Sequence, residues 1–162
     1  MRLQDKVAIV VGAGQSPGEG MGNGRATALT FAREGAKVLC VDHHLESAQE
    51  TVDLIAAKQG SAAAFKADVT KSADIKAMVA DAQTRWGHID VLHNNAGGST
   101  PSGKLVNNPK LLEEFDNVLR LNVRSVVALT QLAVPHLEKT KGNVVNISSV
   151  AGITPLGFVY ST

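Results

Sequence analysis

A glycine-rich stretch near the amino terminus constrains the fold of this chain more than any other feature. Six glycines fall within residues 12–24, directly after the apolar run 6–11 and before the helical pattern of residues 25–33. This order predicts the first strand, turn and helix of a dinucleotide-binding fold. Glycines let a backbone approach a pyrophosphate, and the N–H groups that begin the helix supply an anion site.

The same stretch has a second interpretation, as a flexible loop. The strict G-x-G-x-x-G spacing does not occur in it, so the glycines alone leave both interpretations open. Residues later in the chain are needed to decide between them.

Length and composition favour one domain, residues 1–162, with a packed core. The chain has 162 residues and a net charge of +1. Because it has no run of basic residues, neither nucleic acid nor an anionic membrane is expected as a partner. The apolar stretches are far shorter than a membrane span, and the first residues lack the apolar core of a signal peptide. We therefore expect a cytoplasmic protein.

The cysteine and histidine residues do not suggest metal chemistry. Cys40, the single cysteine, lies in the apolar run 36–41 and is interpreted as a buried core residue rather than a catalytic thiol. The side chains of the adjacent His43 and His44 diverge, so they do not converge readily on one ion. We expect no metal site, and we interpret the histidines as solvated or near the nucleotide.

Apolar runs and helical patterns alternate along the chain. This alternation predicts an α/β fold with a Rossmann-like, doubly wound parallel sheet covered by helices on both faces. The expected strands are residues 6–11, 36–42, 62–67, 89–93 and 142–148, and the expected helices are residues 25–33, 45–58, 72–86 and 111–139.

Three local features refine this prediction. Ser72 or Asp74 is expected to cap the third helix, whose apolar stripe faces the core. Pro135 is expected to bend or interrupt the last helix. Residues 97–108 are expected to form a mobile loop over the cofactor.

Asp42 ends the second expected strand, about 20 positions beyond the end of the glycine stretch. An acidic residue at this place accepts hydrogen bonds from an adenosine ribose and repels the additional phosphate of NADP, so NAD is favoured. The alternative is that Asp42 only caps the helix after this strand.

The chain resembles the short-chain dehydrogenase/reductase family in four signatures that occur in the family's order. These are the glycine turn, the Asn-Asn-Ala-Gly string 94–97, Asn122 within the long helix, and Ser149 followed by Tyr160. The resemblance implies an NAD-dependent oxidoreductase that interconverts a secondary alcohol and a ketone. It also implies a homo-oligomer, a dimer or tetramer, that pairs through the long helix beginning at Leu111.

The resemblance also implies a role for each signature residue. Tyr160 is the general acid/base, Ser149 bonds the substrate oxygen with Ser148 as a possible substitute, and Asn122 holds a water in a proton relay. The residues implied in cofactor binding are Gly12, Gly22, Asn23 and Gly24 at the pyrophosphate, Asp42 at the ribose, Asp68 and Val69 at the adenine, and Asn95, Ala96 and Gly97 on the adenosine side.

The chain departs from the family pattern in several places. Val11 replaces a threonine, and six extra residues within residues 15–21 are expected to bulge out beside the pyrophosphate. The spacing from Ser149 to Tyr160 is about two residues shorter than usual. The family's active-site lysine would fall beyond Thr162, so we expect the amino-terminal two thirds of an enzyme. A nucleotide-binding fragment or module without catalysis is the alternative.

Overall fold

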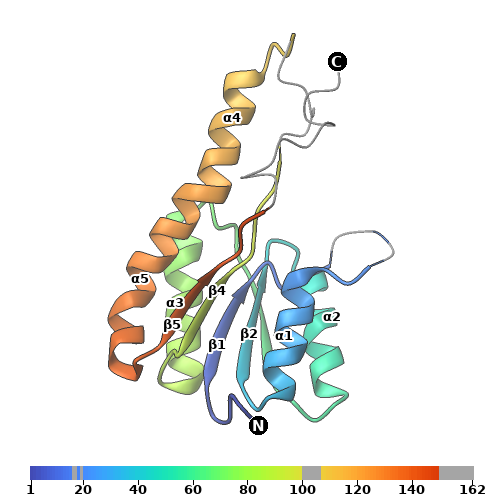
Figure 1. Ribbon diagram of the computed structural model, residues 1–162, viewed down its shortest axis with the longest axis vertical. Coiled ribbons are helices and arrows are strands. Elements are labelled where there is room, and N and C mark those ends of the chain that lie inside the picture. The colour runs from blue at the N-terminus through green and yellow to red at the C-terminus, as the bar shows by residue number, and fades with distance from the viewer. Residues whose placement is uncertain (16–17, 19, 100–106, 150–162) are drawn as a thin grey trace.

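A computed structural model of the chain describes residues 1–15, 18, 20–99 and 107–149. Its centre is a five-stranded parallel sheet with the strand order β3-β2-β1-β4-β5 (Figure 1). The strands are β1 (Val7–Val11), β2 (Lys37–Asp42), β3 (Ser61–Lys66), β4 (Val91–Asn94) and β5 (Asn143–Asn146). Because β1 pairs with both β2 and β4, the strand order reverses direction beside β1. This is the doubly wound topology that the sequence predicts.

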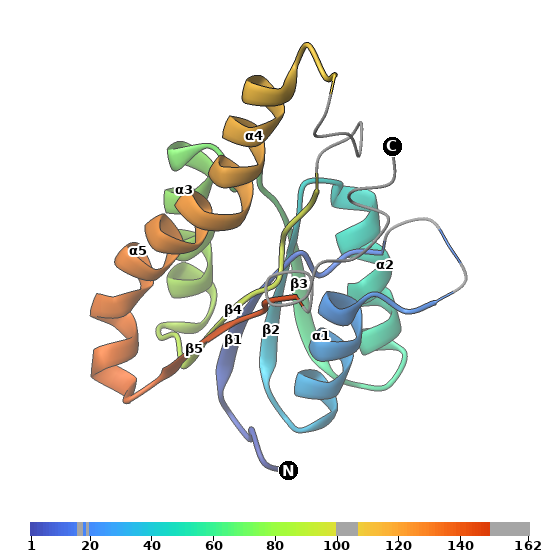
Figure 2. The ribbon, with the colours of Figure 1, turned by 45° about the horizontal axis from the view of Figure 1, so that its top comes forward.

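Helices cover both faces of the sheet (Figure 2). Helices α1 (Asn23–Arg33) and α2 (Leu45–Ala56) lie on one face, and α3 (Ser72–Trp86) lies on the other. A long helical segment packs beside α3, and it consists of α4 (Leu111–Leu119), a π-helical turn η1 (Arg120–Arg124) and α5 (Ser125–Thr140). Within the described residues, no helix is both long enough and apolar enough to span a bilayer.

The core consists of two clusters, one on each side of the sheet. Alternate side chains of a strand point to opposite faces. Ile9, Leu39 and Leu92 therefore pack with α3 and α5, whereas Val10 and Cys40 pack with α1 and α2. Full burial of a side chain such as Ile9 contributes about 1.5–3 kcal/mol to folding. Burial also raises the pKa of the Cys40 thiol to about 12, so Cys40 is a core residue, as the sequence indicates.

Two details of the helices differ from the prediction. The first is the α3 cap: α3 follows Lys71, and no side chain caps it, because the Asp74 carboxylate instead accepts the backbone N–H of Asp68 at 2.9 Å. The second is Pro135, where the expected interruption is wrong, since α5 continues to Thr140. Proline leaves one helical carbonyl without its donor, and both Pro135 and Gln131, whose carbonyl is affected, face solvent.

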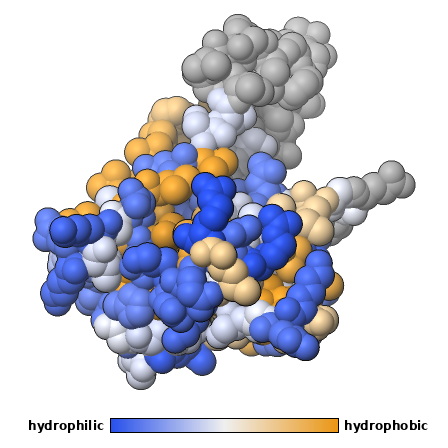
Figure 3. Space-filling model, turned by 60° about the horizontal axis from the view of Figure 1, so that its bottom comes forward, coloured by the Kyte–Doolittle hydropathy of each residue, from blue (hydrophilic) through white to orange (hydrophobic). Residues whose placement is uncertain are grey.

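Asp90 organises the amino ends of the strands. Its buried carboxylate accepts the backbone N–H of Val7 at 2.9 Å and lies 2.9 Å from Lys6 Nζ and 3.1 Å from His88 Nε2. In the space-filling view this end of the molecule is mostly hydrophilic (Figure 3). The opposite end of the sheet, where the strands finish, contains the candidate site.

Candidate functional site

A cavity of about 970 Å³ opens at the carboxyl ends of the strands. The ends of β1 and β2 and the loop after β4 contribute to its wall, and α1 contributes its first turn. The cavity therefore lies at the reversal of strand order, where open α/β sheets bind their ligands. Of the expected cofactor-binding residues, all ten line this cavity: Gly12, Gly22, Asn23, Gly24, Asp42, Asp68, Val69, Asn95, Ala96 and Gly97.

The turn from β1 to α1 is packed too closely for side chains at two of its glycines. Gly12 has a φ of +77°, and a Cβ there would lie 2.9 Å from the Ala96 nitrogen. A Cβ on Gly24 would lie 1.8 Å from the Gly12 carbonyl oxygen. Glycine is thus required at Gly12 by the backbone conformation and at Gly24 by the close approach of helix and strand.

The Gln15 side chain bonds across the additional residues in this turn. Its Nε2 donates to the Gly20 carbonyl at 2.7 Å, and its Oε1 accepts the Gly22 N–H at 2.8 Å. The expectation that this segment bulges beside the pyrophosphate falls partly on residues 16, 17 and 19, which lie outside the described residues. Gln15 itself lines the cavity, a role that sequence reasoning missed.

A hydrogen-bonded network connects α2 to the turn between β1 and α1. The buried Thr51 hydroxyl donates to the Ala13 carbonyl at 2.8 Å and accepts from Arg25 Nε at 3.0 Å. Arg25 also pairs with Glu50 at 2.8 Å. Ser47 accepts the Gln15 backbone N–H at 2.6 Å. Helix α2 therefore fixes the position of the backbone that borders the cavity.

Asp42 stands at the end of β2 and bonds to the glycine turn. Its Oδ2 accepts the Gly14 N–H at 3.0 Å, and its Oδ1 accepts the His44 N–H at 3.0 Å. His43 Nδ1 lies 3.1 Å from the same Oδ1. The alternative that Asp42 caps α2 is wrong, because the cap position belongs to His44 and no side-chain bond caps that helix.

Gly14 and the two histidines are further cavity residues that the assigned site did not include. A Cβ on Gly14 would lie 2.6 Å from the Ser47 hydroxyl oxygen, so this position is tightly packed. The sequence signal that could have identified Gly14 as a cavity residue is its place in the glycine stretch. The histidines directly follow Asp42. Their ring centroids lie 3.8 Å apart with the planes tilted by 46°, so the expected divergence of the two side chains is wrong. In the described ranges, no group of three histidine, cysteine, aspartate or glutamate side chains is arranged to hold a metal ion.

Asp68 and Val69 follow β3 on the next part of the cavity wall. The Thr70 hydroxyl donates to Asp68 Oδ1 at 2.6 Å and the Thr70 N–H donates at 3.0 Å, and these bonds lower the pKa of Asp68. Asp68 also lies 3.4 Å from Lys71 Nζ. Val69 is buried in the core cluster, so only part of it is available to a ligand.

The loop after β4 connects the glycine turn to the long helix. Asn95 Nδ2 donates to the Gly12 carbonyl at 3.0 Å. Asn122 Oδ1 accepts the Gly98 N–H at 2.9 Å, and Asn122 Nδ2 donates to the Gly98 carbonyl at 2.7 Å. Asn122 lies in η1, and π-helical turns of this kind are frequent at functional sites.

The expected catalytic residues are described only in part. Asn122 is exposed, and Ser148 and Ser149 are exposed just beyond β5, whose pairing with β4 extends to a bond from the Ile147 N–H to the Asn94 carbonyl. Tyr160 lies outside the described residues, as does most of the expected mobile loop, residues 100–106.

A model of the family described as short chain dehydrogenase matches residues 6–162. The chain belongs to the short-chain dehydrogenase family. The resemblance inferred from the sequence is therefore confirmed. The chain spans a little more than half of the length of the first curated relatives it matches.

Individual relatives support the same family and fold. The 3-oxoacyl-[acyl-carrier-protein] reductase FabG of Thermotoga maritima is 37% identical over 94% of this chain and 59% of its own. A solved 7 alpha-hydroxysteroid dehydrogenase, complexed with NADH and 7-oxo glycochenodeoxycholic acid, is 35% identical with a TM-score of 0.86, covering 96% of this chain and 57% of its own. A metagenomic short-chain oxidoreductase in complex with NADP is 29% identical with a TM-score of 0.84. The match covers 99% of this chain and 70% of that oxidoreductase.

Proposed function

We propose that this protein is an oxidoreductase that transfers a hydride between a nicotinamide dinucleotide and a secondary alcohol or its ketone, with NAD preferred. The observation that carries the proposal is the glycine turn, closed against Ala96 and the first turn of α1 at the edge of the cavity. This backbone surface admits no side chain at Gly12 or Gly24 and suits a pyrophosphate.

The residues around the cavity fit a nicotinamide dinucleotide. Gly22 and Asn23 begin α1, where the helix dipole favours the negative pyrophosphate. Asp42 would accept hydrogen bonds from the adenosine ribose. The adenine would lie between Asp68 and Val69 on one side and Asn95, Ala96 and Gly97 on the other. When bound, the nicotinamide accepts or supplies the hydride.

The preference for NAD rests on the Asp42 carboxylate. Its side chain is 13% exposed, so part of it remains available at the cavity. A carboxylate at the ribose repels the 2′-phosphate of NADP, because like charges that approach closely cost free energy. Solved relatives bound to NADH and to NADP support nicotinamide dinucleotides as the ligand class.

The proposed catalytic roles follow the family resemblance. Tyr160 exchanges the proton of the substrate hydroxyl, and Ser149 donates a hydrogen bond to the substrate oxygen. A tyrosine with an ordinary pKa of about 10 is a weak base at neutral pH, so the reaction requires positive charge nearby. Asn122 would orient a water for proton relay from its place in η1, where its amide is held by Gly98.

Calorimetry and turnover together test this function. NAD is expected to bind with NADP weaker, and NADH formation from a panel of secondary alcohols is expected to be lost in Tyr160→Phe while NAD binding is retained. NAD binding without turnover in the unaltered protein would support the alternative of a nucleotide-binding module. Failure to bind either dinucleotide would overturn the proposal.

We also propose that the protein associates with a second copy of itself through the long helical segment. Six exposed apolar side chains follow one another along it at spacings of three, four or seven residues: Leu112, Phe115, Leu119, Val123, Val127 and Val134. Such spacing places them on one side of a helix. The family resemblance supports a second copy as the partner.

A further inference from the structure

Gln15 lies between the glycine turn and the start of α1, and both its backbone and its side chain are held by hydrogen bonds. The Ser47 hydroxyl of α2 accepts the Gln15 N–H at 2.6 Å and donates to the Gln15 carbonyl at 3.2 Å. The side chain extends toward α1, where Nε2 donates to the Gly20 carbonyl at 2.7 Å and Oε1 accepts the Gly22 N–H at 2.8 Å. These bonds connect α2 to the residue that precedes α1.

The bond to Gly22 satisfies a donor at the beginning of α1. Gly22 is the N-cap of this helix, and the first N–H groups of a helix have no acceptor within it. In a capping box, a glutamate or glutamine at the third helical position accepts the N-cap N–H. Here Arg25 occupies that position, and its Nε donates instead to Thr51 of α2. Gln15 therefore supplies the acceptor from outside the helix.

The residues that follow Gly22 are the ones proposed to bind the pyrophosphate. Asn23 and Gly24 are the first helical residues, and both line the cavity together with Gln15. The direction of their N–H groups depends on how α1 begins. A bond that fixes Gly22 relative to α2 therefore also fixes the direction of these donors.

The Gln15 amide accepts the Gly22 N–H without adding negative charge. A helix N-terminus carries about half a positive elementary charge, which favours a bound anion. The first turn of α1 contains no acidic residue that would cancel this charge. A carboxylate at position 15 could accept the same N–H, but it would repel a pyrophosphate because like charges at short distance cost free energy. An amide at this position therefore suits an anionic ligand better than a carboxylate does.

We propose that Gln15 is a positioning residue for the dinucleotide. Its side chain orients the start of α1 toward the pyrophosphate, and its neutral amide leaves the positive end of the helix available to that anion. This inference rests on the proposed dinucleotide site.

The test compares Gln15→Ala and Gln15→Glu by calorimetric titration with NAD and by urea denaturation. Gln15→Ala is expected to bind NAD about fivefold more weakly, because the hydrogen bonds that orient α1 are lost. Gln15→Glu is expected to bind NAD at least about tenfold more weakly, because it adds a negative charge. The order of stability is expected to be the reverse, since a carboxylate still accepts the Gly22 N–H and favours a helix N-terminus. A role in folding alone would give affinity and stability the same order.

Adenosine and a second glutamine provide the controls. Adenosine has no phosphate, so its affinity, measured by NMR titration, is expected to be the same in the unaltered protein and in both Gln15 variants. The matched variant is Gln49→Ala on α2, where the exposed Gln49 side chain donates to Asp53 at 2.8 Å. Gln49→Ala is expected to bind NAD as tightly as the unaltered protein does.

Two results would overturn the inference alone, with NAD still bound by the unaltered protein. The first is a Gln15→Glu variant that binds NAD as tightly as Gln15→Ala or more tightly. The second is a loss of adenosine affinity in the Gln15 variants as large as their loss of NAD affinity. Failure of the unaltered protein to bind NAD would overturn the dinucleotide site and the inference with it.

Discussion

At the scale of single residues, the close packing of the glycine turn depends on positions that have no side chain. We expect Gly24→Ala to lower the free energy of unfolding by about 3 kcal/mol, because its Cβ would lie 1.8 Å from the Gly12 carbonyl oxygen and the backbone must separate. Urea denaturation measures this loss, and NAD affinity is expected to fall with it. The matched control is Gly20→Ala, where no described atom lies within 4 Å of the added Cβ. Equal losses in the two variants would contradict the packing argument.

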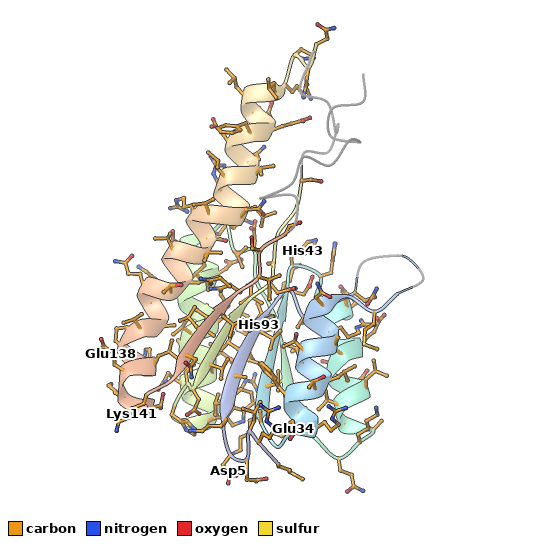
Figure 4. All side chains as sticks on the ribbon, in the orientation of Figure 1. Asp5, Glu34, His43, His93, Glu138 and Lys141 are labelled. Atoms are coloured by element: carbon orange, nitrogen blue, oxygen red, sulfur yellow. The ribbon has the colours of Figure 1, made fainter. Side chains whose placement is uncertain are left out.

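His93 gives the fold its own dependence on pH. His93 lies in β4 (Figure 4) and is buried. Its ring and that of Phe31 are nearly perpendicular, with 6.0 Å between centroids, and burial lowers the pKa of His93. Among the described residues its Nδ1 has no hydrogen-bond partner. The unfolded chain therefore binds a proton more readily than the folded protein does, and stability is lost as the pH falls below about 6.5.

His93→Leu is expected to reduce this acid loss of stability. Leucine cannot gain a proton, so the free energy of unfolding should fall less between pH 7.5 and 5.5 than in the unaltered protein. Chemical denaturation at the two pH values measures the difference, and His136→Gln serves as a histidine control outside the core. The explanation fails if His93→Leu shows the same acid dependence as the unaltered protein.

At the scale of elements, the pattern of apolar runs was sufficient to predict the five strands of the described residues and the helices between them. Buried strands such as β1 are apolar throughout, and parallel connection requires a helix between them, so pattern and topology agree. The uncapped start of α3 and the intact α5 were not predictable in this way. Local sequence permits a cap at Ser72 or Asp74 and an interruption at Pro135. The bond from the Asp68 N–H to Asp74 accounts for the missing cap, and the exposure of Pro135 to solvent accounts for the intact helix.

The site was predictable where it depends on backbone. Gly12, Gly24 and Asp42 were expected at the end of the sheet, where they line the cavity, because strand ends and glycines can be recognised in a sequence. Gln15 was not found, because its two bonds across the turn depend on how the additional residues fold back. The π-helical turn at Asn122 was also missed, since its residues have the same apolar periodicity as an ordinary helix.

The contact between α2 and the glycine turn is a second element-scale feature with a test. Thr51→Val keeps the shape of the side chain but leaves the Ala13 carbonyl and Arg25 Nε without the hydroxyl. We expect a loss of about 1–3 kcal/mol in the free energy of unfolding, together with weaker NAD binding. Thr84→Val is the control, because among the described residues that exposed hydroxyl bonds only to the Ala80 carbonyl of its own helix. A loss in Thr51→Val no greater than in Thr84→Val would show that the network does not stabilise the turn.

At the scale of the whole molecule, the helices on the two faces of the sheet differ in how much apolar surface they expose. The α1 and α2 side presents few large apolar groups, whereas the long helical segment exposes Leu112 at 77% and Val127 at 63%. An apolar stripe of this length is costly in water and is typical of an interface.

The unaltered protein is therefore expected to associate in light-scattering measurements. Val127→Asp should shift it to the monomer because a charge would be buried at the centre of the contact, while Leu54→Asp, on exposed α2, should leave the mass unchanged. If the unaltered protein and Val127→Asp have the same mass, the stripe is not where the copies meet, and its exposure needs another partner.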